Sequence, residues 1–334
     1  MVRIRQGWLV AMLGLGLFAA CKKDDKPAAG TADKPAESSN GATSDDLAFL
    51  PADSEVVLGV NIAQVQQNSL WKGLVEPKLM AGQAQRLIAD FRAKCGFDPM
   101  TSVKSLSLGA RDVAGGKPNA VLVLHGLDKA KALDCVDKLK DELTSGGGEV
   151  TRDGDLVLAK DRRGMQAAVS FLDGGTAIVV VGDNGTTSGV KAVAAGGSKL
   201  RTTAGFAERY KKVNTRDSLW MVVDHALLDK FPLMMKPQAS FGSVNMTDGV
   251  ALDLRIQFEN PGDATAAADL GKSQTQTQAV QEYIDKAEFT AEGAELHATI
   301  KSSSQKLPKL QALITQLVNL ASAFAGGMGG LGTP

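Results

Sequence analysis

The first twenty residues of the chain limit which part of the sequence can fold. Arg3 and Arg5 give a short positive start, residues 8–18 are almost entirely apolar, and two alanines follow. This order of charge, apolar run and small residues is typical of a secretory signal that is removed from the mature protein. The apolar run is too short for a membrane-spanning helix, which needs ~20 apolar residues. We therefore expect residues 1–20 to be a signal peptide and the remainder to fold outside the cytoplasm.

Cys21 stands directly after the small residues, in the first position of the mature chain. The run Leu17-Phe18-Ala19-Ala20-Cys21 resembles the lipobox of bacterial lipoproteins, although that family prefers Leu, Val or Ile where Phe18 stands. The resemblance implies acylation of the Cys21 thiol, with ordinary secretion or a retained anchor as the alternatives. In that pathway an Asp after the cysteine signals retention in the inner membrane, so Lys22 implies an outer-membrane anchor, with the folded part in the periplasm or at the cell surface.

Residues 21–46 are charged, small or turn-forming and include no large apolar side chain. Such a segment cannot bury enough surface to offset the entropy of ordering, so we expect a disordered tether. About 25 residues of flexible chain have a root-mean-square reach of roughly 25–30 Å. The folded part is therefore expected to float close to the membrane without entering it.

Composition limits the class of partner. The chain has 334 residues, enough for one large core or two smaller ones, and its Lys+Arg and Asp+Glu counts are both 37. A nucleic-acid surface needs a clustered basic excess, which is missing here. The expected partners are the membrane, through Cys21, and either an envelope protein or an apolar ligand, with no nucleic acid.

Two cysteines remain once Cys21 carries a lipid. Cys95 and Cys135 form an even pair in an oxidising compartment, and such a pair is expected to form a disulfide. The alternative is two buried, reduced cysteines that pack like small apolar residues.

Short runs rich in β-branched residues alternate with turn residues and amphipathic helical stretches, which predicts an α+β fold. A hairpin turn is expected at Gly115-Gly116. Asp128 is expected to cap a helix over 129–142, and Gly96 to end a helix over 83–94. In the first half, strands are expected at 55–62, 103–110, 120–124, 149–152, 156–160, 167–172 and 177–181.

The second half repeats parts of the first. Asp53–Leu58 is echoed by Asp217–Val222, and Glu149–Gly154 is echoed by Glu288–Gly293. Between the echoes lie strands near 243–245 and over 250–258 and a helix over 263–283, and another strand follows over 296–301. We therefore predict two related halves, each an antiparallel β-sheet with helices packed on one face, although matches of this length also arise by chance.

The predicted domain boundaries follow from these echoes. A first α+β domain is expected over 47–200 and a second over 201–325. The second ends in a helix over 306–324 that carries an apolar stripe, and a flexible glycine-rich tail follows over 326–334.

Three short stretches carry a family resemblance. Leu50-Pro51-Ala52-Asp53, Ser69-Leu70-Trp71 and Cys95-Gly96-Phe97-Asp98-Pro99 resemble a group of uncharacterised bacterial lipoproteins. The likeness covers mostly residues 47–145. It implies a periplasm-facing domain with a disulfide and implies no activity.

No motif in the chain forms a convincing catalytic or cofactor site. Gly327–Gly332 matches G-x-G-x-x-G but does not lie between a strand and a helix. His125, His225 and His297 lack metal-ligand spacing, and only His225, beside Asp224, could act as the base of a hydrolase. We therefore predict no catalytic, metal or cofactor-binding residue.

Two functions from different classes agree with this sequence. The first is a non-enzymatic envelope lipoprotein that acts in binding or assembly. The second is a periplasmic carrier of a hydrophobic ligand or lipid, with the apolar, Met-rich segment 231–235 forming part of its site.

Overall fold

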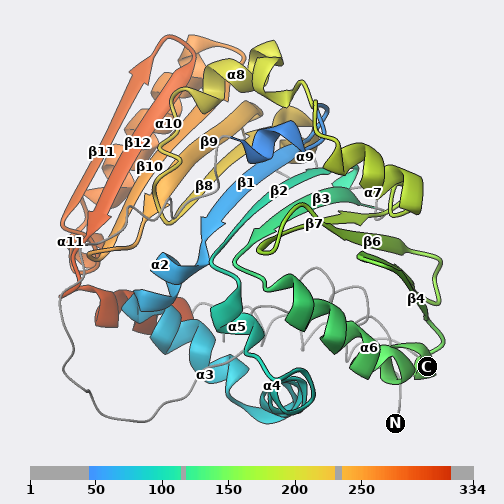
Figure 1. The fold of residues 1–334 in the computed structure, drawn as a ribbon. Helices are drawn as coiled ribbons and strands as arrows, with labels where there is room; N and C mark the ends of the chain where they lie inside the picture. The colour runs from blue at the N-terminus through green and yellow to red at the C-terminus, as the bar shows by residue number, and fades with distance from the viewer. Residues whose placement is uncertain (1–44, 114–117, 230–234, 317–334) are drawn as a thin grey trace, which may run out of the picture.

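The computed structural model describes residues 45–113, 118–229 and 235–316. The signal peptide, Cys21, the tether up to residue 44 and the glycine-rich tail lie outside these ranges, as do the Gly115-Gly116 turn, nearly all of segment 231–235 and the last part of the helix expected over 306–324. The described chain forms one curved antiparallel sheet with helices on both sides (Figure 1).

The sheet has twelve strands in the order β11-β12-β10-β9-β8-β1-β2-β3-β7-β6-β5-β4, and every neighbouring pair is antiparallel. This confirms the predicted α+β class with an antiparallel sheet. Most predicted strands are found within a few residues, whereas β9 is much longer than expected. The strands are β1 (Val56–Asn61), β2 (Ser105–Arg111), β3 (Asn119–His125), β4 (Glu149–Asp153), β5 (Leu156–Lys160), β6 (Gln166–Phe171), β7 (Thr176–Val181), β8 (Leu219–Asp224), β9 (Pro237–Asn245), β10 (Val250–Phe258), β11 (Lys286–Glu292) and β12 (Glu295–Ser302).

The predicted helix boundaries of the first half are confirmed at their caps. Asp128 accepts a hydrogen bond from the Lys131 backbone N–H (2.9 Å), and Gly96 ends α4 with a φ of 71°. The helices are α2 (Ile62–Gln67), α3 (Glu76–Leu79), α4 (Gly82–Cys95), α5 (Pro99–Ser102), α6 (Lys129–Ser145), α7 (Thr187–Ala194), α8 (Ala204–Tyr210), α9 (His225–Leu228), α10 (Pro261–Thr275) and α11 (Gln278–Gln281), with short 3₁₀ helices η1 (Asp46–Ala48) and η4 (Leu200–Thr202) and a π-helix η2 (Trp71–Val75).

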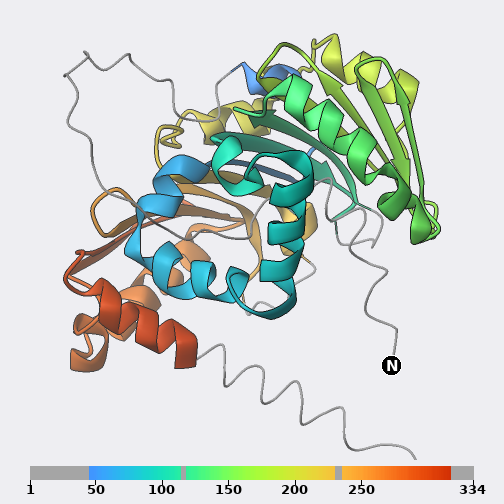
Figure 2. The ribbon, with the colours of Figure 1, turned by 60° about the horizontal axis from the view of Figure 1, so that its bottom comes forward.

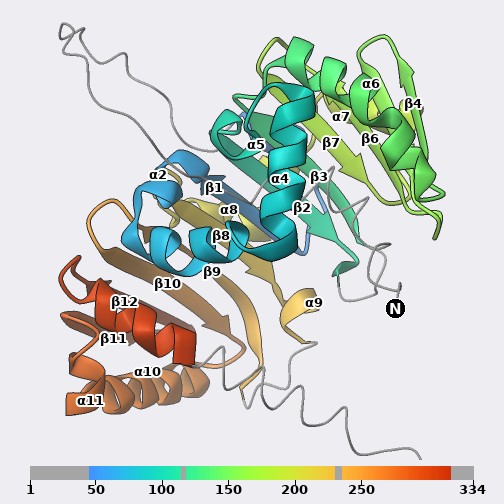
Figure 3. The ribbon, with the colours of Figure 1, turned by 90° about the horizontal axis from the view of Figure 1, so that it is seen from below.

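Both faces of the sheet carry apolar clusters. Successive residues of a strand point to opposite faces. Val121 and Val123 of β3 belong to a buried cluster on the face that we call the outer face. Leu122 and Leu124 belong to a second buried cluster, on the inner face. Figure 3 shows α2–α6 and α10 on the inner side of the sheet, in front of the strands, with α7 and α8 behind it.

The sequence predicted helices on one face only, and in the first half they cover both. Val190 of α7 and Phe206 of α8 are part of the outer cluster, and Leu133 of α6 is part of the inner one. The reason is the continuous apolar run over residues 120–124, which has apolar side chains for both faces. A strand of this kind is stable only when each face is covered.

Strands β1 and β8 join the two predicted domains into one sheet. Val57 pairs with Val222, and Gly59 pairs with Trp220. The outer cluster likewise draws on both domains, because Trp220 and Phe241 pack in it together with residues of the first half. The described parts of the ranges 47–200 and 201–325 therefore share a sheet and a core.

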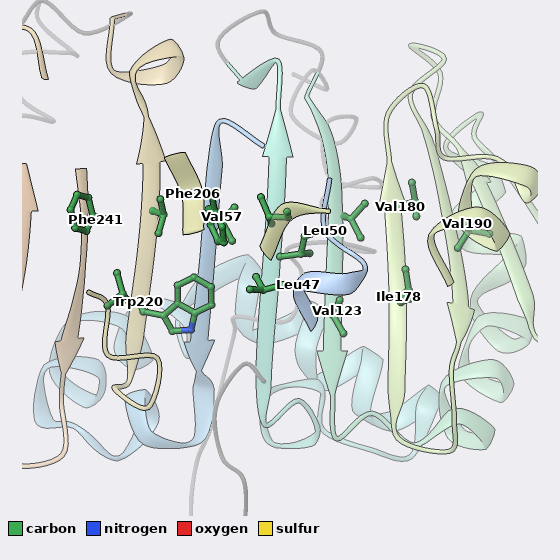
Figure 4. Close-up of a cluster of buried hydrophobic side chains, with 14 of the residues drawn as sticks. Leu47, Leu50, Val57, Val123, Ile178, Val180, Val190, Phe206, Trp220 and Phe241 are labelled. Atoms are coloured by element: carbon green, nitrogen blue, oxygen red, sulfur yellow. The ribbon is translucent and has the colours of Figure 1, made fainter. Parts of the chain in front are cut away.

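The start of the folded chain is part of the outer core. Leu47 and Leu50, on either side of the end of η1, are 1% and 0% exposed. Figure 4 shows both lying among Val57, Val123 and Trp220. Burial of a leucine side chain contributes about 1.5–3 kcal/mol, so this short segment is held firmly against the sheet.

Cys95 at the end of α4 and Cys135 in α6 lie at disulfide-bonding distance, as predicted, with their Cα atoms 4.6 Å apart. Both residues are 4% exposed. The bond ties α4 to α6 on the inner side of the sheet.

Replacing Cys95 and Cys135 together by serine is expected to lower the free energy of unfolding by roughly 4 kcal/mol in the chain-entropy model. The reason is that the bond closes a loop of 40 residues. Urea denaturation of the oxidised wild type and of the variant measures the difference, and reduced wild type serves as the control. An oxidised wild type that unfolds at the midpoint of the variant would contradict the bond.

Candidate functional site

The three histidines lie on different elements, and each has an aspartate beside it. In the pair singled out by the sequence, His225 Nδ1 is 2.5 Å from Asp224 Oδ1, and the His225 side chain is 54% exposed. Asp224 also accepts a hydrogen bond from Arg209 Nη1 (2.8 Å) and caps α9. Among the described residues, no hydroxyl or thiol group hydrogen-bonds to His225. Within the part of the chain that the structure describes, the partner of His225 is therefore Asp224 and not a hydroxyl or thiol group.

His125 belongs to a polar cluster that the sequence analysis did not find. Its Nε2 lies 3.0 and 3.1 Å from the two carboxylate oxygens of Asp46, and Ser107 donates a hydrogen bond to Asp46 Oδ2 (2.6 Å). Asp46 is 2% exposed. Because 79 residues separate His125 from Asp46, no local pattern could have linked them.

This cluster fixes η1 to the sheet. The Thr176 hydroxyl lies 3.4 Å from His125 Nδ1, too far for a strong hydrogen bond. The adjacent Asp173 carboxylate accepts from the backbone N–H groups of Gly175 and Thr176 and shapes the β6–β7 turn. The Asp46–His125 pair instead connects the first described residues to β2 and β3.

The pKa of His125 is raised by its surroundings. The hydrogen bond to Asp46 is the main cause, and it outweighs the burial of the ring, which lowers the pKa. Because the folded-state pKa is above the unfolded value, the protonated ring stabilises the fold fully below the unfolded value of about 6.5. This contribution is lost as the pH rises through the folded-state pKa.

The inner face has an apolar surface across the middle strands. One row of paired residues runs Leu108, Leu58, Met221, Gly242, Leu254 and Ala298, and the next runs Leu106, Val60, Leu219, Val244, Leu252 and Ile300. We call these two rows the inner apolar surface. Neither row contains a charged or hydrogen-bonding side chain. Most of these side chains are half-buried; the exceptions are Leu106, Gly242 and Ala298, which are buried.

On β10 and β12, the opposite face is polar, whereas on β1, β8 and β9 it carries the outer apolar cluster. On β10 and β12, Asp253 lies 3.0 Å from His297 Nε2, and Arg255 donates to Glu295 (2.9 Å). Alternation of this kind places apolar residues inward and charged residues outward. The inner apolar surface therefore belongs to a sheet face that the sequence directs away from water.

The segment from α2 to α4 forms an arch on this inner side. Figure 3 shows it in front of the middle strands, and Figure 1 shows it below them. No residue of η2 or α3 is buried, and Trp71, Leu74 and Val75 are half-exposed. A π-helix such as η2 is rare in proteins and occurs frequently at functional sites.

The arch is fixed at three places. The Asn68 side chain is 5% exposed and donates hydrogen bonds to the carbonyl oxygens of Met246 and Gly249 (2.8 Å each). The disulfide joins its far end to α6. Between these points, Gly73 of η2 leaves room for the side chain of Gln311, on the helix that begins at residue 307 and lies beside the arch (Figure 2).

Comparison with known proteins found no matching family model, curated protein or solved structure. In the described ranges, no helix has the length and apolarity needed to cross a bilayer. The same residues contain no group of three or more His, Cys, Asp or Glu side chains that could hold a metal ion. The inner apolar surface, framed by the arch, is thus the candidate site on geometric grounds.

Substituting His125→Gln is expected to lower the free energy of unfolding by about 1–2 kcal/mol below pH 6.5, because the hydrogen bond to a charged ring is lost. The difference from wild type should shrink as the pH rises through the folded-state pKa. Urea denaturation across this pH range measures it. His297→Gln is the matched control, because its aspartate partner is 48% exposed and the pair contributes little. A pH-independent effect of His125→Gln would contradict the assignment.

Proposed function

We propose that the protein is a non-enzymatic lipoprotein of the bacterial envelope that acts in binding or assembly. The observation that carries this proposal is the inner apolar surface, whose rows cross six neighbouring strands and are not fully covered by the described helices. On β1 and β2 the rows pack in the inner buried cluster through Leu58, Val60, Leu106 and Leu108, so the part that stays half-buried outside the buried clusters lies on β8, β9, β10 and β12. A contiguous apolar surface that is left partly accessible is a candidate interaction site. The surface is therefore the place where we expect a partner or ligand.

The proposed anchor is an acylated Cys21 in the outer membrane, with the folded part in the periplasm or at the cell surface. The N-terminal charge, apolar run and lipobox-like sequence support this placement. Asp46, the first residue of η1, stands 25 positions after Cys21.

We also propose that the fold consists of two related halves. The succession β1, β2, β3, α6, β4, β5 corresponds to β8, β9, β10, α10, β11, β12. Outward from β1, and without the hairpin β6–β7, the strands of the first half follow the order β1-β2-β3-β5-β4. Outward from β8, the strands of the second half follow the corresponding order β8-β9-β10-β12-β11. The arch is a second addition to the first half and contains the helix over 83–94. The echoes are farther apart in the first half, where Glu149 stands 96 positions after Asp53, than in the second, where Glu288 stands 71 positions after Asp217, as such additions require.

A second candidate function is the carriage of a hydrophobic ligand or lipid. The position of the arch favours it, because the arch lies across the middle strands on the inner side (Figure 3). The half-buried state of the row side chains is consistent with partial shielding of the inner apolar surface by the arch. Shielding of this kind is what a carrier needs and what a surface for protein assembly does not need.

The anchor is tested by cell fractionation. The wild-type chain is expected in the outer-membrane fraction and the Cys21→Ser chain in the soluble periplasmic fraction, because the acyl chains provide the anchor. An immunoblot and the mass of the N-terminal peptide report the outcome. A Cys21→Ser chain that stays in the membrane fraction, or a wild-type peptide without an acyl mass, would contradict the anchor.

Native mass spectrometry of the soluble Cys21→Ser chain tests the binding role. We expect an added mass that recurs between preparations and disappears on denaturation. A protein-sized addition favours assembly, and a small apolar molecule favours carriage. A bare chain in every preparation, without any addition, would contradict both forms of the proposal.

A further inference from the structure

We propose that two copies of the chain associate through the edge strand β11, so that the twelve-stranded sheet of one copy continues into the sheet of the other. The partner is a second copy of this chain, and the contact is symmetric about a two-fold axis. The inference goes beyond the proposed function, because it uses neither the anchor at Cys21 nor the inner apolar surface.

Strand β11 is an open edge of the sheet. All of its residues pair with β12 on one side, and no strand pairs with its other side in the part of the chain that the structure describes. Figure 1 shows β11 as the outermost strand of the second half. On the inner side α10 packs over it, where Gly271 lets the Phe289 ring approach the helix. Every side chain of β11 is nevertheless exposed or half-exposed, so the edge is accessible to a partner.

The turn that follows β11 determines which backbone groups point to the open edge. A two-residue hairpin joins β11 to β12, and its Gly293 has a φ of 58°. The residues that close such a hairpin form a hydrogen-bonded pair, and these pairs alternate along the ladder. Glu292 therefore directs its N–H and C=O to β12, as does every second residue before it. Ala287, Phe289 and Ala291 direct their N–H and C=O groups to the open edge.

Only one antiparallel register between two copies uses all of these groups. When Phe289 lies opposite Phe289 of the second copy, Ala287 lies opposite Ala291 of the second copy, and each of the three residues both donates and accepts a hydrogen bond. Any other register leaves at least one of the three without a partner. The pairing is centred on Phe289, as a two-fold axis requires, and it brings the two Phe289 side chains together as a cross-strand aromatic pair.

The charges on the other face of β11 match in this register. Lys286 lies opposite Glu292 of the second copy at both ends of the contact, and Glu288 lies opposite the uncharged Thr290. Within its own chain Lys286 pairs with Glu288 (2.7 Å), whereas Glu292 makes no ion pair with any described residue. Opposite charges in facing positions stabilise a strand pair. The second copy therefore supplies Glu292 with a cation that its own chain does not.

The opposite edge of the sheet, β4, lacks this complementarity. Its hairpin to β5 is also two residues long, with Gly154 at a φ of 59°, so Val150 and Arg152 direct their backbone groups outward. Pairing of two copies through these residues would place Glu149 opposite Asp153 of the second copy. Like charges in facing positions destabilise a strand pair, and charged residues commonly protect edge strands in this way. Self-association is therefore expected at β11 and not at β4.

Sedimentation equilibrium of the full chain with Cys21→Ser tests the proposal, because this substitution removes the acylation site and leaves β11 unchanged. We expect monomer and dimer in an equilibrium that shifts to the dimer as the concentration rises. A chain that stays monomeric up to about 1 mM would overturn the proposal. A mass that grows beyond the dimer would also overturn it, because contact between β11 and β4 of different copies would be open-ended.

Charge reversal then locates the contact. Lys286→Glu is expected to weaken the dimer roughly tenfold or more, because it places like charges opposite each other at both ends of the contact. Glu292→Lys should act in the same way, and the variant with both changes should restore the dimer. Lys160→Glu is the matched control, because it makes the same charge change on an exposed residue of β5. Dimers that the single variants leave unchanged, or that the double variant fails to restore, would overturn the assignment to β11.

Proline tests the backbone bonds separately. The N–H of Ala291 points to the open edge, so Ala291→Pro removes bonds between the copies and leaves the β11–β12 ladder intact. Loss of the dimer is expected, and thermal unfolding checks that the variant is folded. Arg152→Pro makes the matched change at the β4 edge and should leave the dimer unchanged. A folded Ala291→Pro chain that dimerises as the parent chain does would contradict the strand pairing.

Discussion

The antiparallel pairing of β1 with β8 is the interaction on which the rest of the structure depends. It joins two sets of strands into one sheet of twelve. Without it, Trp220 and Phe241 would no longer share the outer cluster with Val57. Both inner rows would also be interrupted at this strand pair, one between Leu58 and Met221 and the other between Val60 and Leu219. The candidate site thus exists because two halves of the chain share a sheet.

Each face of this sheet has a different role. The outer face is closed by η1, α7 and α8, and it holds the first described residues through Leu47, Leu50 and the Asp46–His125 pair. The inner face is covered by α6 and α10 at its sides and by the arch across the middle strands, and Ile62 of α2 and Leu133 of α6 pack in its buried cluster. The proposed membrane anchor and the candidate site thus lie on opposite faces of the sheet.

Local features of the fold could be predicted from the sequence. The cap at Asp128, the helix end at Gly96 and the hairpin β4–β5 follow from residue types at fixed spacing, and the Cys95–Cys135 pairing followed from counting cysteines in an oxidising compartment. The coverage of both faces in the first half was missed, although the unbroken apolar run over 120–124 already carries that signal.

Contacts between distant residues could not be predicted in the same way. The Asp46–His125 pair and the Asn68 bonds to the β9–β10 turn join residues 79 or more positions apart, and the side chains involved are common polar ones. The two inner rows likewise appear only once the register of six strands is known. Their residues read in the sequence as ordinary core positions, so the candidate site has no motif.

Nuclear magnetic resonance of the Cys21→Ser chain labelled with ¹³C-methyl methionine tests the central claim most directly. Met221 lies in the middle of the inner apolar surface, whereas Met100 is 2% exposed at the start of α5 and serves as an internal reference. Titration with palmitate is predicted to shift the Met221 methyl signal to saturation and to leave that of Met100 in place. A Met221 signal that does not move while the protein binds palmitate would contradict the account.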